Sequence, residues 1–288
     1  MPPAPSSTLI ATLGTEAQVV TLALDCLLAK DEPVSRVMVL HTLPPDGLIP
    51  EAVERVRAEF SSSYYSNSIQ LQLIEMRGSQ GALLDVDSAE GAEVALQTIY
   101  RVLRQEKLDE RRVHFCIAGG RKTMSLFGMA AAQMLFDKDD HLWHLITHGK
   151  LLEEKRMHAA EGEEAIMVEI PITLWSAISP ALTDLINIDD PLQAVERQRA
   201  LRLHESYDRA RVFVMGSLSY AERRVVRLLV REGLGDKEIA TRLGLSSRTV
   251  ETELAEARRL AAAHWDLPDV TRTQLVALLA LYFASNPD

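Results

Sequence analysis

Two short glycine-containing segments carry the residues best suited to hold phosphate groups. They are Leu13-Gly14-Thr15-Glu16-Ala17-Gln18 and Ala118-Gly119-Gly120-Arg121-Lys122-Thr123. Each follows a short apolar run typical of a strand, and each precedes a pattern typical of a helix. The start of a helix offers unpaired backbone N–H groups and a positive dipole end to an anion. Arg121 could grip a phosphate with two hydrogen bonds, and Lys122 could act as a point charge.

Neither segment has the spacing of the common nucleotide-binding motifs. Arg121 separates Gly120 from Lys122, which breaks the Gly-x-x-x-x-Gly-Lys-Ser/Thr pattern of a P-loop, and no Gly-x-Gly-x-x-Gly occurs. We therefore expect neither a nucleoside triphosphate nor a dinucleotide, and no cofactor. The glycines permit close backbone approach and positive φ. Thr123 is a candidate cap for the following helix, and its hydroxyl could also bind a ligand.

The histidines and cysteines do not predict a metal site. His141, His144 and His148 lack the spacing of zinc ligands. On a strand, His144 and His148 would share one face and His141 would lie on the other. Cys26 and Cys116 form no Cys-x-x-Cys, and we expect both to be buried thiols without a disulfide.

Strands and helices are expected to alternate through the first 150 residues. The apolar patterns predict strands at 8–13, 37–40, 69–74, 113–117 and 142–147, and helices at 17–29, 50–60, 88–105 and 123–136. This alternation predicts an α/β fold with a doubly wound, mostly parallel, Rossmann-like sheet, to which 165–170 adds an edge strand. In the strand order 3-2-1-4-5, the first and fourth strands flank the crevice where ligands bind. The two glycine-containing segments leave those strands and should meet.

Two stretches of the chain resemble CARF domains, the Rossmann-like sensor domains associated with CRISPR systems. They are TLGTEAQVVTLALDCLL and VHFCIAGGRKTMSLFGMAAAQMLF, and the resemblance extends over about residues 8–175. It implies a homodimer that binds a cyclic oligoadenylate across its two-fold axis. The ligand-binding residues that it implies in this chain are Gly14, Thr15, Gln18, Gly119, Gly120, Arg121, Lys122 and Thr123.

The chain departs from the family pattern at Glu16 and Ala17, where Ser-Pro is usual, so a carboxylate lies beside the expected phosphates. Some CARF domains also cleave their ligand without metal, by attack of a ribose 2′-hydroxyl on the adjacent phosphate. In such a ring nuclease, Thr15 and Lys122 would be the candidate catalytic residues. The sequence leaves open a sensor, a ring nuclease and a plain nucleotide-binding adaptor, and it does not give the ring size.

The C-terminal part has the pattern of four short helices. Ser219 and Glu222 form a capping-box pattern, Asp236 and Ser246 are candidate caps of helices at 237–243 and 247–260, and a last helix is expected at 271–283. The stretch LSYAERRVVRLLVREGLGDKEIATRLGLSSRTVETELAEARRL resembles LuxR-type helix-turn-helix domains. That resemblance implies a dimer whose third helix enters the major groove of double-stranded DNA. The candidate DNA-binding residues are Lys237, Arg242, Ser247, Arg248, Thr249, Thr252 and Arg258.

The charge of this C-terminal region supports DNA binding less clearly than its helical pattern does. Glu251, Glu253 and Glu256 lie on the third helix, where they would repel phosphates. Residues 218–288 contain ten Lys and Arg against ten Asp and Glu, and the whole chain has a net charge of −10. Two hypotheses therefore stand: DNA binding, or a helix-turn-helix kept for dimerisation or for docking another protein.

These patterns predict three regions: a ligand-sensing domain at 1–175, a connector at 176–217 and a helix-turn-helix domain at 218–288. The charged helical stretch at 192–215 is either a packing or dimerisation helix, or a lever that transmits ligand binding. We expect a frayed tail at 1–7, no signal peptide, no membrane segment and a cytoplasmic location. The expected function is regulation of a type III CRISPR system in response to cyclic oligoadenylate.

Overall fold

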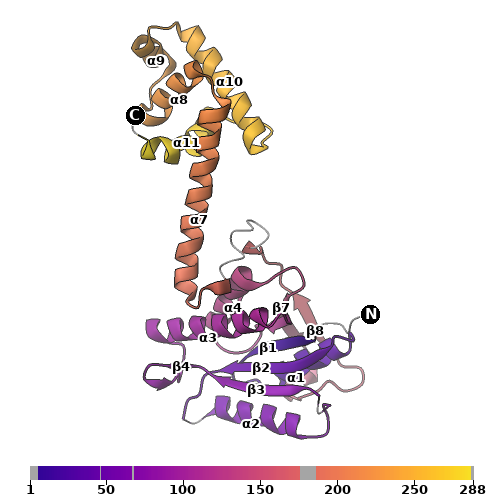
Figure 1. Ribbon diagram of the computed structural model, residues 1–288. Helices are drawn as coiled ribbons and strands as arrows, with labels where there is room; N and C mark the ends of the chain where they lie inside the picture. Colours follow the sequence, from indigo (N-terminus) through magenta and orange to yellow (C-terminus); the bar gives the residue numbers. More distant parts are fainter. Residues whose placement is uncertain (1–5, 46, 67, 176–185, 287–288) are drawn as a thin grey trace. The chain divides into compact units, whose positions relative to one another are not determined.

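The computed structural model describes residues 6–45, 47–66, 68–175 and 186–286 (Figure 1). Its backbone contacts divide the chain into two compact units, Met1–Arg197 and Gln198–Asp288. Residues 1–5 of the expected tail and residues 176–185 of the expected connector lie outside the described residues. Ser7, which we assigned to the frayed tail, is instead the buried first residue of a strand.

The N-terminal unit contains a six-stranded sheet in the order β3-β2-β1-β6-β7-β8. The first five in this order are parallel, and β8 is antiparallel to β7. The predicted doubly wound order is confirmed, with β1 and β6 side by side at its centre. The strands are β1 (Ser7–Leu13), β2 (Val34–His41), β3 (Gln70–Glu75), β6 (Arg112–Cys116), β7 (His141–Thr147) and β8 (Ala165–Glu169).

Helices cover both faces of this sheet, as Figure 1 shows. The helices α1 (Gln18–Leu28) and α2 (Leu48–Ser61) pack on one face, and α3 (Ala89–Leu108) and α4 (Lys122–Leu135) pack on the other. Along β1, Leu9 points to the first face and Ile10 to the second, because successive side chains of a strand alternate. All seven residues of β1 are buried, as expected for a central parallel strand.

Three short elements were not predicted from the sequence. β4 (Arg77–Gly78) and β5 (Gly81–Ala82) form an antiparallel pair after β3, and α5 (Gly149–Glu153) follows β7. Gly81 has a φ of 120°, which other residues rarely adopt. The segments after these elements supply charged residues to the carboxyl edge of the sheet. Asp85, after β5, reaches Arg121 at the start of α4, and Lys155, after α5, reaches Glu16 just before α1.

The C-terminal unit is helical. The second half of α7 (Pro191–Val212) continues into a π-helical turn, η2 (Phe213–Ser217), and the next helices are α8 (Tyr220–Glu232), α9 (Asp236–Leu243), α10 (Ser247–Trp265) and α11 (Arg272–Ser285). Their shared core includes Phe213, Val225, Val250 and Leu275, each fully buried. The C-terminal helix-turn-helix that the sequence predicted is thereby confirmed.

Two of the three helix caps predicted for the C-terminal unit are confirmed. Ser219 forms a capping box with Glu222, and the Ser246 hydroxyl accepts from the N–H of Thr249. The prediction for Asp236 is wrong, because α9 begins after Gly235 and the Asp236 carboxylate binds Arg272 at 2.5 Å.

Two further expectations concern thiols and membranes. Cys116 is buried as predicted, whereas Cys26 is only half-buried and its Sγ donates to the carbonyl of Ala165 at 3.2 Å. Neither cysteine is in a disulfide. Within the described ranges, no helix combines the length and the apolar character needed to cross a membrane.

Candidate functional site

The two glycine-containing loops meet at the carboxyl ends of β1 and β6. A Cβ atom on Gly14 would lie 3.0 Å from the backbone nitrogen of Gly120, and a Cβ atom on Gly119 would lie 2.0 Å from the carbonyl oxygen of Thr12. The Thr12 hydroxyl also donates to the carbonyl of Gly119 at 2.7 Å. Only glycine leaves room for such an approach, so these residues allow the backbones of the two loops to touch. The loops meet as the strand order predicted.

The helices that begin at these loops have no side-chain cap. The N-cap of α4 is Arg121, whose side chain does not bond to the helix, so the prediction that Thr123 caps it is wrong. Thr123 is instead the half-buried second residue of α4. The N-cap of α1 is Ala17. The first N–H groups of both helices therefore lack a side-chain acceptor, as suits a site for an anion.

The guanidinium of Arg121 is bound by the carboxylate of Asp85. Its Nε donates to Oδ1 at 2.7 Å, and its Nη2 donates to Oδ2. These hydrogen bonds lower the pKa of Asp85 and raise the pKa of Arg121. The carboxylate makes the two-point contact that Arg121 was expected to make with a phosphate. Asp85 was not predicted from the sequence, because the turn Ser79-Gln80 before it lacks the Asn-Gly or Gly-x pattern typical of a two-residue hairpin.

Glu16 connects the first loop to a third segment of the chain. Its carboxylate accepts from Lys155 Nζ at 2.7 Å, from Gln18 Nε2 at 2.7 Å and from the Thr15 hydroxyl at 3.3 Å. Partial burial raises the pKa of Glu16, but the hydrogen bonds from Lys155 and Gln18 outweigh it, and the pKa lies below its usual value. Lys155 comes from the segment after α5, and no sequence signal pointed to it. It neutralises the acid that departs from the family pattern.

Gln18 leaves one polar atom without a partner. The side chain is 3% exposed, and its Oε1 has no hydrogen-bond partner among the described residues. A buried acceptor without a donor is costly, so it is typical of a site that a ligand completes. Thr15 and Lys122, the other polar residues predicted at these loops, are exposed.

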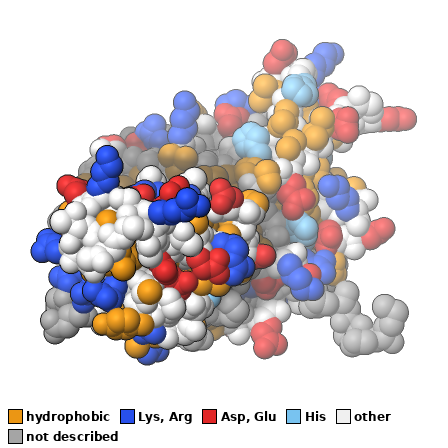
Figure 2. Space-filling model, turned by 90° about the horizontal axis from the view of Figure 1, so that it is seen from above, with side chains coloured by type: hydrophobic (Ala, Val, Ile, Leu, Met, Phe, Trp, Pro, Cys, Tyr) orange, Lys and Arg blue, Asp and Glu red, His pale blue; other side chains and the backbone are white. Residues whose placement is uncertain are grey.

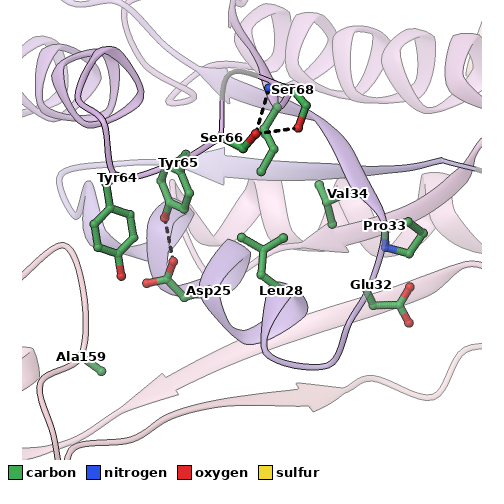
Figure 3. A pocket seen from close by; sticks show the side chains of 11 residues that line it. Asp25, Leu28, Glu32, Pro33, Val34, Tyr64, Tyr65, Ser66, Ser68 and Ala159 are labelled. Atoms are coloured by element: carbon green, nitrogen blue, oxygen red, sulfur yellow. Dashed lines mark hydrogen bonds between the residues drawn. The ribbon is translucent and has the colours of Figure 1, made fainter.

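A cavity of about 700 Å³ lies at the opposite, amino edge of the sheet (Figure 3). The carboxylate of Asp25 is already bound there, because the Tyr65 hydroxyl donates to it at 2.9 Å and His158 Nδ1 lies 2.7 Å away. Glu32, also in its wall, pairs with Arg112 at 3.2 Å. The cavity contains none of the ligand-binding residues predicted from the sequence, and its acids are occupied, so we do not assign the phosphate site to it.

The histidines of β7 do not gather. The strand ends at Thr147, so His148 is the N-cap of α5 and does not share a strand face with His144 as expected. In the part of the chain that the structure describes, no group of three or more His, Cys, Asp or Glu side chains is arranged to hold a metal ion.

The outer face of α10 is the candidate nucleic-acid surface. Arg248, Glu251, Thr252 and Arg259 are exposed along it at helical spacing. Arg259 was not predicted, although it lies seven residues after Thr252 on the same side. It binds Glu256 at 2.6 Å and so neutralises one of the three glutamates. Arg258 is half-buried and lines a cavity together with Leu254 and Glu251.

The other candidate DNA-binding residues are all exposed. Arg242 is paired with Glu232 at 2.8 Å, and this carboxylate partly neutralises its charge. In Figure 2, basic and acidic side chains are interspersed over the visible surface without one large basic area. The remaining exposed candidates are Lys237, Ser247 and Thr249.

Comparison with known families agrees with this two-part organisation. Residues 16–202 match the family model of CRISPR-associated protein NE0113, and residues 213–260 match that of sigma-70, region 4. The second match supports the helix-turn-helix, through a family model other than the LuxR type. No curated protein matches the chain. A CRISPR-associated domain followed by a helix-turn-helix indicates a CRISPR-linked, DNA-binding regulator. Since the first match covers more than half of the chain, the protein belongs to the family of CRISPR-associated protein NE0113.

Proposed function

We propose that this protein senses cyclic oligoadenylate and thereby controls DNA binding by its helix-turn-helix. The observation that carries the proposal is the contact between two uncapped, glycine-containing helix starts, with Arg121 and Lys122 beside them. Backbone N–H groups and both cations suit the phosphates of the ring. The unpaired Oε1 of Gln18 suits a donor such as the amino group of adenine.

A homodimer fits the apolar surface at the same edge of the sheet. Leu48, Leu84, Leu126 and Leu152 all follow the carboxyl ends of strands, and each is at least 51% exposed. Exposed large apolar side chains around a polar site are typical of an interaction surface. In the proposed dimer, a second copy covers these leucines and the ring lies between the two copies.

Binding of the ring would exchange the partner of Arg121. The guanidinium now holds Asp85 through Nε and Nη2, and in our proposal a ligand phosphate replaces that carboxylate. This exchange joins ligand binding to a movement of the segment after β5. We propose it as the first conformational step of the sensor.

Sensing is favoured over ring cleavage because Thr15 has no poised base beside it. Among its described contacts, the nearest carboxylate is Glu16, which is ionised and bound to Lys155. A general base acts best when its pKa is near the working pH. Ring cleavage with Thr15 and Lys122 as catalytic residues therefore stays the alternative, to be measured in the same samples.

Calorimetric titration with rings of three to six adenylates tests the proposal. Charge-assisted phosphate contacts are worth about 1.5–3 kcal/mol each, so Lys122→Ala should weaken binding at least about tenfold and Arg121→Ala/Lys122→Ala further. Lys138→Ala is the matched control, because Lys138 is exposed outside the site. Unchanged affinity in a folded double variant would refute the site. Linear products ending in 2′,3′-cyclic phosphate, lost in Thr15→Ala, would establish the nuclease.

A further inference from the structure

A cavity in the C-terminal unit combines an apolar floor with a cluster of arginines. It has a volume of about 260 Å³ and is formed by η2, α8 and α11. Neither α9 nor α10, the helix-turn-helix pair, contributes to its wall. We call it the arginine cavity. Its lining includes Val214, Met215, Tyr220, Arg223, Arg224, Arg227 and Phe283.

The three arginines of the cavity have no carboxylate partner among the described residues. Arg223 donates through Nε to the carbonyl of Leu218 at 3.2 Å, and Arg224 lies 5.7 Å from the centre of the Tyr220 ring. Arg227 is exposed and makes no described polar contact.

Other arginines of the same unit do have such partners. Arg242 binds Glu232, Arg259 binds Glu256 and Arg272 binds Asp236. These three acids thus pair with arginines outside the arginine cavity, and no described acid pairs with Arg223, Arg224 or Arg227.

Large apolar side chains are exposed at the rim. Tyr220 is 74% exposed and Met215 is 59% exposed. The thioether of Met215 lies 3.8 Å from Nη1 of Arg223, so apolar and cationic groups share one surface. Methionine, tyrosine and arginine are the side chains enriched at protein interfaces.

The floor of the cavity is held in place by polar contacts behind it. Asn286 Nδ2 donates to the Tyr207 hydroxyl at 3.0 Å and to the carbonyl of Tyr282 at 2.8 Å. The Tyr282 ring lies 5.2 Å from the ring of Phe283, measured between centroids. The apolar pocket is therefore formed before any partner arrives, which lowers the entropy cost of binding.

We propose that the arginine cavity binds an acidic peptide segment of a partner protein. One apolar side chain of that segment fills the cavity, and its carboxylates bind the arginines. Arg223 and Arg227 are separated by about 6 Å along the helix axis. Carboxylates on alternate residues of an extended peptide are separated by about 6.6 Å, so two of them can engage two arginines at once.

A nucleic acid fits these features less well. Bases bind by stacking on open aromatic faces, and Arg224 lies over a face of Tyr220, the most exposed ring of the cavity. The apolar floor of Val214 and Phe283 suits an aliphatic or aromatic side chain. The inference does not depend on what binds at Arg121.

The test uses the full chain and a fluorescein-labelled synthetic peptide series. Each peptide alternates glutamate with a central residue that is leucine, phenylalanine, tryptophan or serine, and a control series carries lysine in place of glutamate. Fluorescence anisotropy should show binding that requires glutamate and is at least fivefold weaker with serine at the centre. Arg227→Glu should weaken this binding at least fivefold. The matched control Arg202→Glu makes the same charge change at an exposed position of α7, outside the cavity, and should leave this binding unchanged.

Four results would overturn the proposal. One is that no acidic peptide binds better than its lysine counterpart; another is that a folded Arg227→Glu variant binds as the unchanged protein does. Binding of fluorescein-labelled oligothymidylate in place of the peptides, lost in Arg227→Glu, would assign the cavity to nucleic acid. A change of sedimentation by Arg227→Glu without any peptide would assign it to a second copy of this chain.

Discussion

In the N-terminal unit, α1 and α4 begin without a side-chain cap, whereas in the C-terminal unit the hydroxyls of Ser219, Ser246 and Thr271 cap α8, α10 and α11. Two arginines of these units differ in whether a carboxylate binds them. Arg121 of the N-terminal unit holds a carboxylate, and Arg227 of the C-terminal unit holds none. The starts of α1 and α4 thus lack a side-chain acceptor, whereas Arg227 lacks a carboxylate partner among the described residues.

The difference separates two ways of preparing for a negative charge. A side-chain cap is worth about 1 kcal/mol, so α1 and α4 forgo stability that the capped helices have. Local rules of this kind are broken mainly at functional sites. At the glycine loops, the proposed donors are backbone N–H groups, and Arg121 exchanges Asp85 for the ligand. At the arginine cavity, the arginines can bind a ligand without first releasing a carboxylate.

The largest effect is expected for Gly119→Ala. The new Cβ would lie 2.0 Å from the carbonyl oxygen of Thr12, which is backbone of a central strand and cannot move away. We expect the unfolding free energy to fall by about 3 kcal/mol, together with loss of ligand binding. Gly216→Ala is the control in the C-terminal unit, because its Cβ would meet nothing within 4 Å. Chemical denaturation measures the unfolding free energy of the two variants. Equal stabilities would contradict the close contact between the loops.

A moderate effect is expected for Asp85→Asn. The amide keeps the shape of the side chain but removes the charge that holds Arg121, and such exposed ion pairs are worth about 0.2–1 kcal/mol. Cyclic oligoadenylate should therefore bind up to about fivefold more tightly, as measured by calorimetry. Asp87→Asn is the matched control, because Asp87 is exposed and makes no described hydrogen bond to Arg121. If Asp85→Asn binds no better than that control, the exchange of partners at Arg121 is wrong.

The smallest effect is expected on the acidic face of α10. Glu251→Gln/Glu253→Gln removes two charges that repel phosphates, so non-specific affinity for duplex DNA should rise by about two- to fivefold at low salt. Gel shifts measure it, with Glu51→Gln, an exposed position of α2, as the control. A fall in affinity would mean that these glutamates contact bases, since glutamate can accept from cytosine.

The sequence predicted the elements whose patterns are local. The apolar run of β1, the alternation of strands and helices, and the serine caps of α8 and α10 are all visible in a single segment. The contact between Gly14 and Gly120 was also predictable, because strand order alone brings the ends of β1 and β6 together.

The partners of the site could not be predicted, because they come from elements with weak patterns. Asp85 follows a two-residue strand, and Lys155 follows a helix of five residues. Nothing in the spacing of Arg121 or Glu16 specifies which distant charge will reach it. The arginine cavity has the same origin, since it joins residues of η2, α8 and α11 that no local pattern connects.

The central claim is that the two glycine loops hold the phosphates of a cyclic oligoadenylate. The most direct measurement is a crystal structure of the full chain with the ring that calorimetry selects. We expect a phosphate at the start of α4 within hydrogen-bond distance of Lys122, with the guanidinium of Arg121 moved from Asp85 onto that phosphate. A ring bound in the cavity beside Asp25 and Tyr65, or an Arg121 still paired with Asp85 when the ring is present, would contradict the claim.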